Sequence, residues 1–193
     1  MKSRFLMAAV LASCFCSPVW AATYAVDPDH SSVSFKVKHL LSKTQGRFNQ
    51  FEGTIEYEPG KPETWAASGT IQAGSIDTNE PKRDQHLKSA DFFDAEKYPT
   101  ILFKSTGVRD ATETGAKLEG VFTMHGVEKP LALDVTINGV GQDPWGNTRA
   151  AFTATTKLNR RDFGIQWNQK LDQGGFLVGD DVDITLEIEG IRK

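Results

Sequence analysis

Apolar and polar residues alternate along most of this chain with the period of two that is typical of half-buried β-strands. The pattern is clear in residues 31–40, where Val33, Phe35 and Val37 share one face and serine and lysine share the other. It is equally clear in residues 182–190, where isoleucine and leucine alternate with acidic residues and threonine. The alternation predicts strands at 31–40, 47–57, 65–73, 101–108, 117–125, 131–138, 149–158 and 182–190.

Short polar turns separate these segments, at 59–62, 110–115, 125–126 and 143–147. Seven or eight strands with short turns and one apolar face each indicate an all-β antiparallel sandwich or barrel. The apolar faces mix long aromatic residues with small ones, a composition that suits either a filled interior or one that holds a slender ligand. The pattern alone leaves these alternatives open.

Residues 75–103 interrupt the series of strands and combine a charged cluster with the aromatic pair Phe92 and Phe93. Asn79 is expected to cap one short helix, with Pro81 inside its first turn, and Ser89 to cap a second. Pro99 then returns the chain to a strand. The stretch is therefore predicted to be a helical insertion of two short helices, which serves as a lid or as an active site.

The first 21 residues have the features of a cleavable secretory signal. Lys2 and Arg4 precede an apolar run over residues 5–15, which is too short to span a bilayer, and small residues lead up to Ala21. We therefore predict cleavage after Ala21, export to the periplasm and a single mature domain of residues 22–193 without a transmembrane segment.

Both cysteines, Cys14 and Cys16, lie inside the predicted signal. The mature chain is thus expected to have no disulfide, no thiol catalysis and no cysteine-bound metal. An alternative for Cys14 is lipidation, because residues 11–14, Leu-Ala-Ser-Cys, are similar to a lipoprotein processing site. Loss of the two basic signal residues would lower the formal charge from −3 to −5, which offers no electrostatic reason to bind nucleic acid.

The histidines and acids offer a few candidate sites. His39 points inward by strand parity, either as a buried residue bonded to the backbone or as a contact for a ligand. Residues 27–30, Asp-Pro-Asp-His, contain metal-ligand types but lack a second histidine at a suitable spacing, so a local turn is favoured. Asp84 and His86 are two residues apart on a helix and do not face each other, whereas His125 is expected to face outward.

Arg160 and Arg161 precede Asp162 at the end of a predicted strand. One arginine could bind a phosphate at the rim of a barrel, or it could form a structural salt bridge with Asp162. No Gly-x-Ser-x-Gly motif and no glycine-rich phosphate loop occurs in the chain. The residues therefore give no catalytic signature, and neither a cofactor nor a metal is expected.

Several motifs occur in one order along essentially the whole mature chain: Asp27-x-x-His30-Ser31-x-Val33-x-Phe35-x-Val37-x-His39, Gly46-Arg47-Phe48-x-x-Phe51-x-Gly53, Ser75-Ile76-Asp77-Thr78, Arg83-Asp84-x-His86-Leu87-x-Ser89-x-Asp91-Phe92-Phe93, Tyr98-Pro99-x-Ile101-x-Phe103, Gly120-x-Phe122-Thr123-x-His125-Gly126-Val127 and Asn159-Arg160-x-Asp162-Phe163-Gly164. In these motifs the chain resembles the YceI-like lipid/polyisoprenoid-binding family. The resemblance implies an exported, lipocalin-like antiparallel barrel of eight strands that holds a long isoprenoid or related amphiphile and has no enzyme activity.

This resemblance and the strand parity together suggest which residues would bind a ligand. The expected partner is a polyprenyl lipid, an isoprenoid quinone or a fatty amide, bound as a ligand rather than as a cofactor, and a homodimer is left open. Two alternatives remain, a small periplasmic enzyme that uses His39 or His86 with a neighbouring acid, and a solid barrel that binds nothing. The expected tail contacts are Val33, Phe35, Val37, Phe48, Phe92, Phe93, Phe103, Phe122, Leu133, Phe152 and Ile184, and the expected head contacts are His39, Arg83, His86 and Arg161.

Overall fold

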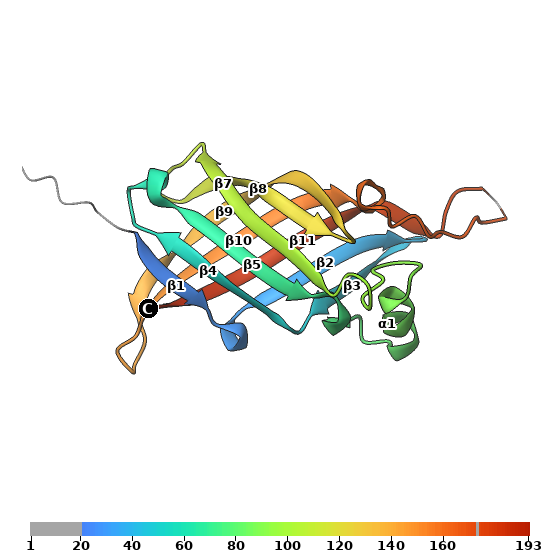
Figure 1. Cartoon of the computed structure of the whole chain (residues 1–193), viewed down its shortest axis with the longest axis horizontal. Helices are drawn as coiled ribbons and strands as arrows, with labels where there is room; N and C mark the ends of the chain where they lie inside the picture. Colours follow the sequence, from blue (N-terminus) through green and yellow to red (C-terminus); the bar gives the residue numbers. More distant parts are fainter. Residues whose placement is uncertain (1–20, 173) are drawn as a thin grey trace, which may run out of the picture.

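The computed structural model describes residues 21–172 and 174–193, so the predicted signal, apart from Ala21, lies outside the described residues. In this part of the chain no helix is both long enough and apolar enough to cross a membrane. Most of it is β-strand (Figure 1). The strands are β1 Ala22–Val26, β2 Ser32–His39, β3 Ser42–Phe48, β4 Phe51–Tyr57, β5 Ala66–Gln72, β6 Ile76–Asp77, β7 Thr100–Arg109, β8 Gly115–Met124, β9 Val127–Gln142, β10 Thr148–Asn159 and β11 Val178–Arg192.

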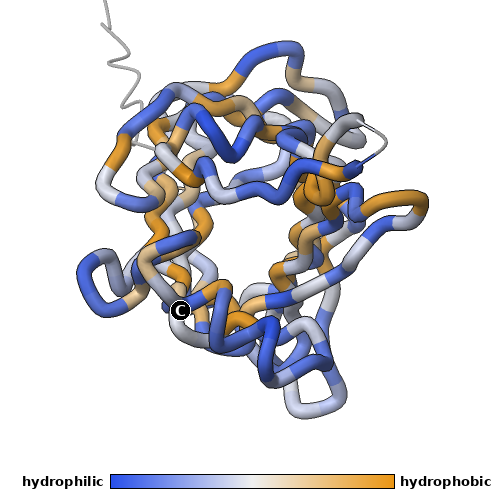
Figure 2. Tube along the Cα trace, turned by 90° about the vertical axis from the view of Figure 1, so that its right-hand side faces the viewer, coloured by the Kyte–Doolittle hydropathy of each residue, from blue (hydrophilic) through white to orange (hydrophobic). Residues whose placement is uncertain are grey.

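The strands form a closed antiparallel barrel, in the order β4-β5-β7-β8-β9-β10-β11, and β1 completes the ring by pairing with both β4 and β11. After the short 3-10 turn η1 (Pro28–His30), β2 takes over from β1 and pairs with the first part of β11. The next strand, β3, pairs with β2 and leads into β4. The chain therefore encloses its interior with eight strands, and Figure 2 shows the closed ring seen along the axis. The predicted fold class, an antiparallel eight-stranded barrel with a helical insertion, is confirmed.

Four connections gather at one end of the barrel, which we call the mouth (Figure 1). They are the β2–β3 turn, the β5–β7 connection, the β8–β9 turn and the β10–β11 connection. The opposite end, the base, holds an aromatic cluster in which the rings of Trp65 and Phe152 each lie 5.1 Å from the ring of Tyr57. The two ends thus differ, because long connections cover the mouth whereas aromatic side chains pack at the base.

The insertion differs from its prediction, because it contains one α-helix, α1 (Pro81–Lys88), rather than two. Asn79 adopts a left-handed conformation (φ 59°) with its N–H donating to Asp77 Oδ1, so the helix is capped one residue later by Glu80. Ser89 ends α1 by donating its hydroxyl to the His86 carbonyl at 2.8 Å. The chain then continues in turns up to β7, which brings Phe92 and Phe93 back toward the barrel.

β1, the first half of β3 and the two-residue β6 lie outside the predicted segments, as do residues 127–130 and 139–142 of β9 and residues 178–181 of β11. In β1 the run is too short for its alternation to stand out, since only five residues pair. Residues 42–45 of β3 are polar or charged and mostly exposed, so they have no apolar face to reveal them. Backbone pairing with neighbouring strands holds β1 and the first half of β3 in place.

Residues 27–30 form the predicted local turn, in which Asp27 caps η1 by accepting the N–H of Asp29 at 3.1 Å. The carboxylates of Asp27 and Glu189 lie near the His30 imidazole, as metal ligands would. Arg149 occupies this place instead, with Nη1 2.7 Å from both carboxylates. The cluster is therefore an ion-pair network, and the guanidinium charge that it contains opposes a cation.

Arg149 also donates from Nε to Asp143 in the β9–β10 turn at 2.8 Å, and this contact has a consequence for stability in acid. The bonds from Arg149 and then Asn147 hold the pKa of Asp143 far below its usual 3.8, and those from Arg149 and His30 lower the pKa of Asp27. A carboxyl whose pKa is lower in the folded state stabilises the fold above its unfolded pKa, and this contribution is lost as the pH falls. The network should therefore stabilise the barrel at neutral pH and weaken below about pH 4.

We expect the urea midpoint of unfolding to fall as the pH decreases through 3.8 and below, and to fall less in Asp143→Asn, which has lost the titrating group. Chemical denaturation at a series of pH values would measure this. Asp110→Asn is a matched control, because Asp110 is exposed in the β7–β8 turn. Equal acid sensitivity of Asp143→Asn and the unsubstituted protein would contradict the assignment.

Candidate functional site

The barrel encloses a cavity of about 590 Å³ that is lined mainly by apolar side chains. It extends from Tyr57 and Trp65 at the base to Trp167 and Leu177 at the mouth. Its wall is made by inward-facing residues of the barrel strands, because successive side chains of a strand point to opposite sides. The interior is thus hollow and apolar, a distinction that the sequence pattern had left open.

Glycines help to keep this interior open. The ring of Phe35 on β2 lies against Gly46 of β3, where a Cβ atom would overlap it. In the same way the ring of Phe103 on β7 lies against Gly120 of β8. These aromatic rings therefore lie along the wall, over residues that have no side chain, instead of extending across the cavity.

Most of the residues expected to contact a ligand have their side chains in the cavity wall. Whether they contact a ligand stays a prediction, but the position of those on strands follows from the strand parity that suggested them. The wall includes Val33, Phe35, Val37, His39, Phe48, Arg83, His86, Phe92, Phe93, Phe103, Phe122, Leu133, Phe152 and Ile184.

Arg161 is the exception among these residues, since it does not line the cavity. Its exposed guanidinium donates to Asp180 at 2.7 Å and lies 5.8 Å from the centre of the Phe176 ring. The neighbouring Arg160 lines the cavity instead. The alternation of the strand ends at Asn159, where the 3-10 turn η4 (Arg160–Phe163) begins, so parity could not tell which arginine turns inward.

Arg160 is only 4% exposed, and its side-chain hydrogen bonds go to the β10–β11 connection and to the start of β11. It donates to the carbonyls of Ile165, Trp167 and Gly179, each at 2.9 Å, and to Asp180 at 3.2 Å. Burial lowers the pKa of this guanidinium, and the charge of Asp180 opposes that effect. The acid that pairs with both arginines is thus Asp180, rather than the expected Asp162, and Arg160 fixes the β10–β11 connection at the mouth.

His86 pairs with a carboxylate that the sequence did not suggest. Its Nε2 lies 2.9 Å from Asp91 Oδ2, because the chain turns back after Ser89. Asp84 does not contact it, as helical spacing had predicted, and instead accepts the N–H and hydroxyl of Thr78. The turn at Ser89, which ends the helix that carries His86, is the signal that could have revealed the His86–Asp91 pair.

The remaining polar groups at the mouth lie around Thr78, which is buried at the start of the insertion. Arg83 donates from Nε to the Thr78 hydroxyl at 2.7 Å and from Nη2 to its carbonyl at 2.8 Å. Lys82, Arg83, His39 and His86 all border the cavity. Several cationic or protonatable groups therefore lie at one end of an otherwise apolar space.

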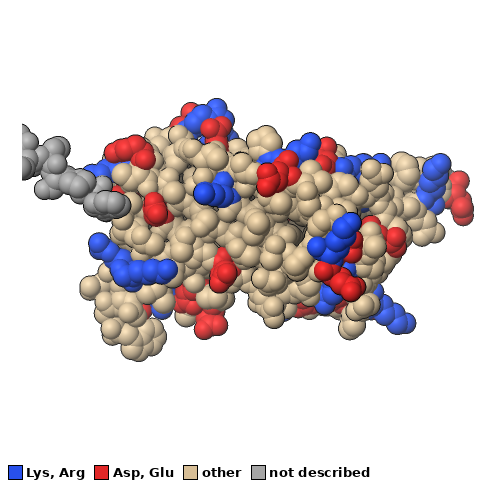
Figure 3. All heavy atoms as spheres, in the orientation of Figure 1, with Lys and Arg blue, Asp and Glu red and all other residues tan. Residues whose placement is uncertain are grey.

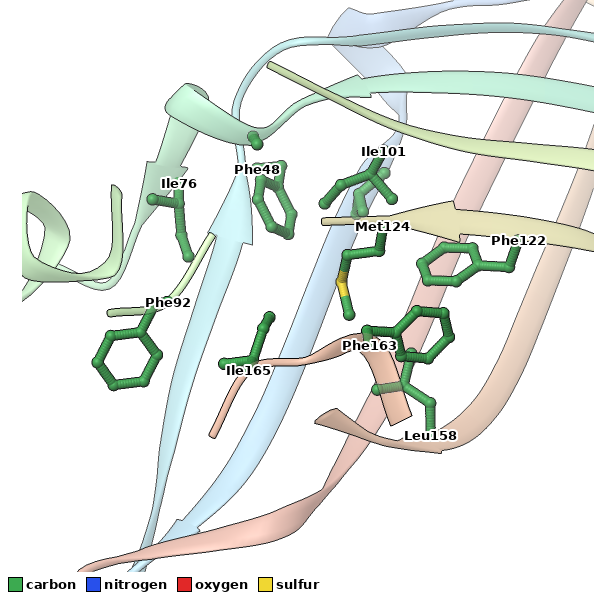
Figure 4. Close-up of a cluster of buried hydrophobic side chains, with 11 residues drawn as sticks. Phe48, Ile76, Phe92, Ile101, Phe122, Met124, Leu158, Phe163 and Ile165 are labelled. Carbon is green, nitrogen blue, oxygen red and sulfur yellow. The ribbon is translucent and has the colours of Figure 1, made fainter. Parts of the chain in front are cut away.

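The insertion and the β10–β11 connection meet over the mouth. The Trp167 ring lies 4.9 Å from that of His86 and 5.1 Å from that of Phe92. Figure 4 shows Phe92 and Ile165, from these two connections, on the side of the cluster away from Phe122. Side chains of both connections therefore cover this end of the cavity.

His125 lies outside the cavity, as expected, but it is packed rather than freely exposed. Its ring lies 4.7 Å from that of Tyr98, and its Nδ1 is 3.0 Å from the Phe163 carbonyl. This contact joins the β8–β9 turn to the β10–β11 connection, so His125 has a structural place at the mouth.

A closed antiparallel barrel with a hollow apolar interior and a covered mouth places this chain among the small hollow β-barrels. Residues 24–190 match the family model of the YceI-like domain, and the chain therefore belongs to the YceI-like family. Among curated proteins it is 40% identical to a UPF0312 protein of Vibrio cholerae, over 98% of this chain and 99% of that one. A UPF0312 protein of Shewanella baltica is also 40% identical, over the full length of both chains.

Solved structures share the fold. BcnA of Burkholderia cenocepacia superposes with a TM-score of 0.76 at 24% identity, covering 85% of this chain and 98% of that one. The YceI protein of Campylobacter jejuni superposes with a TM-score of 0.68 at 28% identity, covering 81% and 90%. A polyisoprenoid-binding domain from Saccharophagus degradans, implicated in plant cell wall breakdown, has a TM-score of 0.66 at 12% identity, covering 90% and 99%.

Proposed function

We propose that this protein is an exported, periplasmic binding protein that holds a long-chain isoprenoid lipid, or a similar amphiphile, for carriage or storage. The ligand would be a polyprenyl lipid, an isoprenoid quinone or a fatty amide, with its tail in the cavity. The observation that carries the proposal is the continuous apolar cavity of about 590 Å³ inside a closed barrel.

The cavity suits a tail better than a polar substrate. Burial of apolar surface contributes roughly 25 cal/mol per Å², so a tail that buries about 400 Å² would gain about 10 kcal/mol before the cost of ordering it. Polar groups are concentrated at the mouth, where Lys82, Arg83, His39 and His86 border the cavity. This separation of an apolar space from a polar end matches the two parts of an amphiphile.

The comparisons support the same class of ligand. The Saccharophagus domain is described as polyisoprenoid-binding and shares this fold, although at 12% identity the likeness concerns the fold alone. Membership of the YceI-like family adds support for a binding protein rather than an enzyme. The groups at the mouth would select among polyprenyl lipid, quinone and fatty amide.

The His86–Asp91 pair at the mouth favours the alternative function, an enzyme. In such an enzyme the carboxylate would orient the imidazole as a general base. The ring packing of His86 against Phe92 and Trp167 gives this histidine a structural role as well. His86→Ala separates the two functions, since a binding protein should retain most of its affinity for the tail.

Gentle purification from the periplasm of the original host, followed by native mass spectrometry, is expected to show the protein with a long-chain lipid bound. Protein stripped of lipid should then take up a short-tailed isoprenoid quinone, which would quench Trp65 and Trp167 in the cavity wall. A folded protein that carries no lipid and takes up neither quinones nor polyprenyl lipids would refute the proposal.

A further inference from the structure

Exposed apolar side chains gather where two connections project from the mouth. Leu40 and Leu41 lie in the β2–β3 turn, and Phe176 lies in the β10–β11 connection. Leu41 is fully exposed and Phe176 is 52% exposed. We call these three residues the apolar tip. Figure 1 shows both connections at the right-hand end, where the β10–β11 connection reaches beyond the strands.

The two parts of the apolar tip are held together by backbone bonds. The Leu40 N–H donates to the Leu177 carbonyl at 3.0 Å, and His39 pairs with Val178. Asn168 fixes the other side, since its side chain bonds to both the N–H and the carbonyl of Val178. The apolar tip is therefore built into the end of the sheet.

Apolar surface continues from the tip into the cavity. Leu177 and Val178 directly follow Phe176 and line the cavity, and so does Trp167 from the same connection. His39, next to Leu40, also borders it. An aliphatic chain could thus move between the outside and the interior while it stays in contact with apolar side chains.

Charged side chains of both signs surround the apolar tip. Lys38 on β2, Lys43 on β3 and Lys170 in the β10–β11 connection flank the tip, together with the acids Asp172 in that connection and Asp180 and Asp183 on β11. Lys43 also pairs with Asp183 on β11 at 2.7 Å. The full chain carries a formal charge of −3, and Figure 3 shows both signs scattered over the face that it draws. The tip therefore combines apolar side chains with lysines and acids around them.

We propose that the apolar tip docks the mouth of the barrel on the surface of a phospholipid bilayer. Leu40, Leu41 and Phe176 would reach the boundary of the acyl chains, while the lysines lie among the headgroups. Three side chains on a projecting end are few for a stable protein interface, which buries about 800 Å² on each partner. The docking needs no ligand, whereas transfer of an amphiphile through the mouth rests on the proposed function.

A fluorescent probe at the tip tests the docking. The mature chain is expected to have no cysteine, so Leu41→Cys can be labelled with an environment-sensitive dye. With vesicles of phosphatidylethanolamine and phosphatidylglycerol, we expect a blue shift and a gain in intensity. Trp145→Cys is the matched control, since Trp145 is 79% exposed in the β9–β10 turn at the base and should show no change.

Substitution of the tip should weaken the docking. Removal of a leucine and a phenylalanine in the double variant Leu41→Ser/Phe176→Ser should lower vesicle affinity at least about tenfold. The control Val140→Ser/Trp145→Ser removes exposed apolar side chains at β9 and the base and should bind as the unsubstituted protein does. Flotation with the same vesicles measures both.

Three outcomes would overturn the inference. A dye response at position 145 instead of 41 would place the contact at the base. A response at 41 that depends on protein concentration without vesicles would indicate a second copy of the chain. Absence of any response would exclude docking, and uptake of a short-tailed quinone from solution would show whether the proposed function survives.

Discussion

Ala154→Phe should weaken the binding of a long-chain amphiphile roughly a hundredfold while the barrel stays folded. Ala154 on β10 is buried in the cavity wall, between Val135 of β9 and Leu186 of β11, which also face inward. A phenyl ring at this position would extend into the space that a tail needs. Phenylalanine adds no polar atom that would lack a partner there.

The expected effect is large because the tail supplies most of the binding free energy. Each buried methylene contributes about 0.8 kcal/mol, so displacement of four methylenes costs about 3 kcal/mol, roughly a hundredfold in affinity. The cavity has room for the ring, so the folded state should lose less than an overpacked core does. Quenching of tryptophan fluorescence by an isoprenoid quinone would measure the affinity.

Ala151→Phe is the matched control on the same strand. Ala151 pairs with Glu189 and faces away from the cavity, in the opposite parity to Ala154. It should leave the affinity unchanged. Equal loss in both variants would mean that the substitutions act on the fold, and unchanged binding in Ala154→Phe would place the ligand elsewhere.

Strand parity, which separates Ala154 from Ala151, could be predicted from the sequence wherever one face of a strand is apolar. Val33, Phe35 and Val37 were assigned to the interior in this way, and they line the cavity. The pattern did not extend to the polar half of β3, where both faces carry polar side chains. Periodicity reports burial, so it gives no signal in a strand that is exposed on both sides.

The strand pattern alone could not predict the hollow interior that the family resemblance implied, because it depends on how the strands close and tilt and on how side chains of different strands fit together. Phe103 illustrates this, since its ring lies against Gly120 of the neighbouring strand. Only the pairing of β7 with β8 brings these residues together. A sequence pattern gives the face of each residue but not its neighbours across the sheet.

The mouth was the hardest part to predict, because many of its side chains lie on turns or on α1 rather than on strands. Helical spacing correctly separated Asp84 from His86, yet the partner of His86 is Asp91, which a turn brings into place. Likewise, the 3-10 turn at Arg160 decides which arginine is buried. Turns change direction within one or two residues, and the parity rule ends where they begin.

The two arginines of this turn give the second large prediction. Arg160→Met should lower the free energy of unfolding by roughly 3–5 kcal/mol, whereas Arg161→Met should change it by less than about 1 kcal/mol. Both side chains contact Asp180, so they form a matched pair that differs in burial. Urea denaturation at neutral pH would measure the difference.

The two substitutions differ in whether the hydrogen-bond acceptors that lose their donor are buried or exposed. Without Arg160, the carbonyls of Ile165, Trp167 and Gly179 lose a donor at a place that water reaches poorly. A buried polar group without a partner costs about 1–3 kcal/mol. Arg161 is exposed and bonds to Asp180, so water can replace it.

The same substitution should change the function of the mouth. Arg160 bonds to the Trp167 carbonyl, and the Trp167 ring covers the cavity together with His86 and Phe92. A loosened connection should let a bound amphiphile leave faster, so Arg160→Met should raise the dissociation rate at temperatures where the barrel remains folded. Stopped-flow transfer of a quinone to empty acceptor protein measures this rate. If Arg160→Met and Arg161→Met lost equal stability and released ligand at equal rates, Arg160 would have no special part in holding the mouth closed.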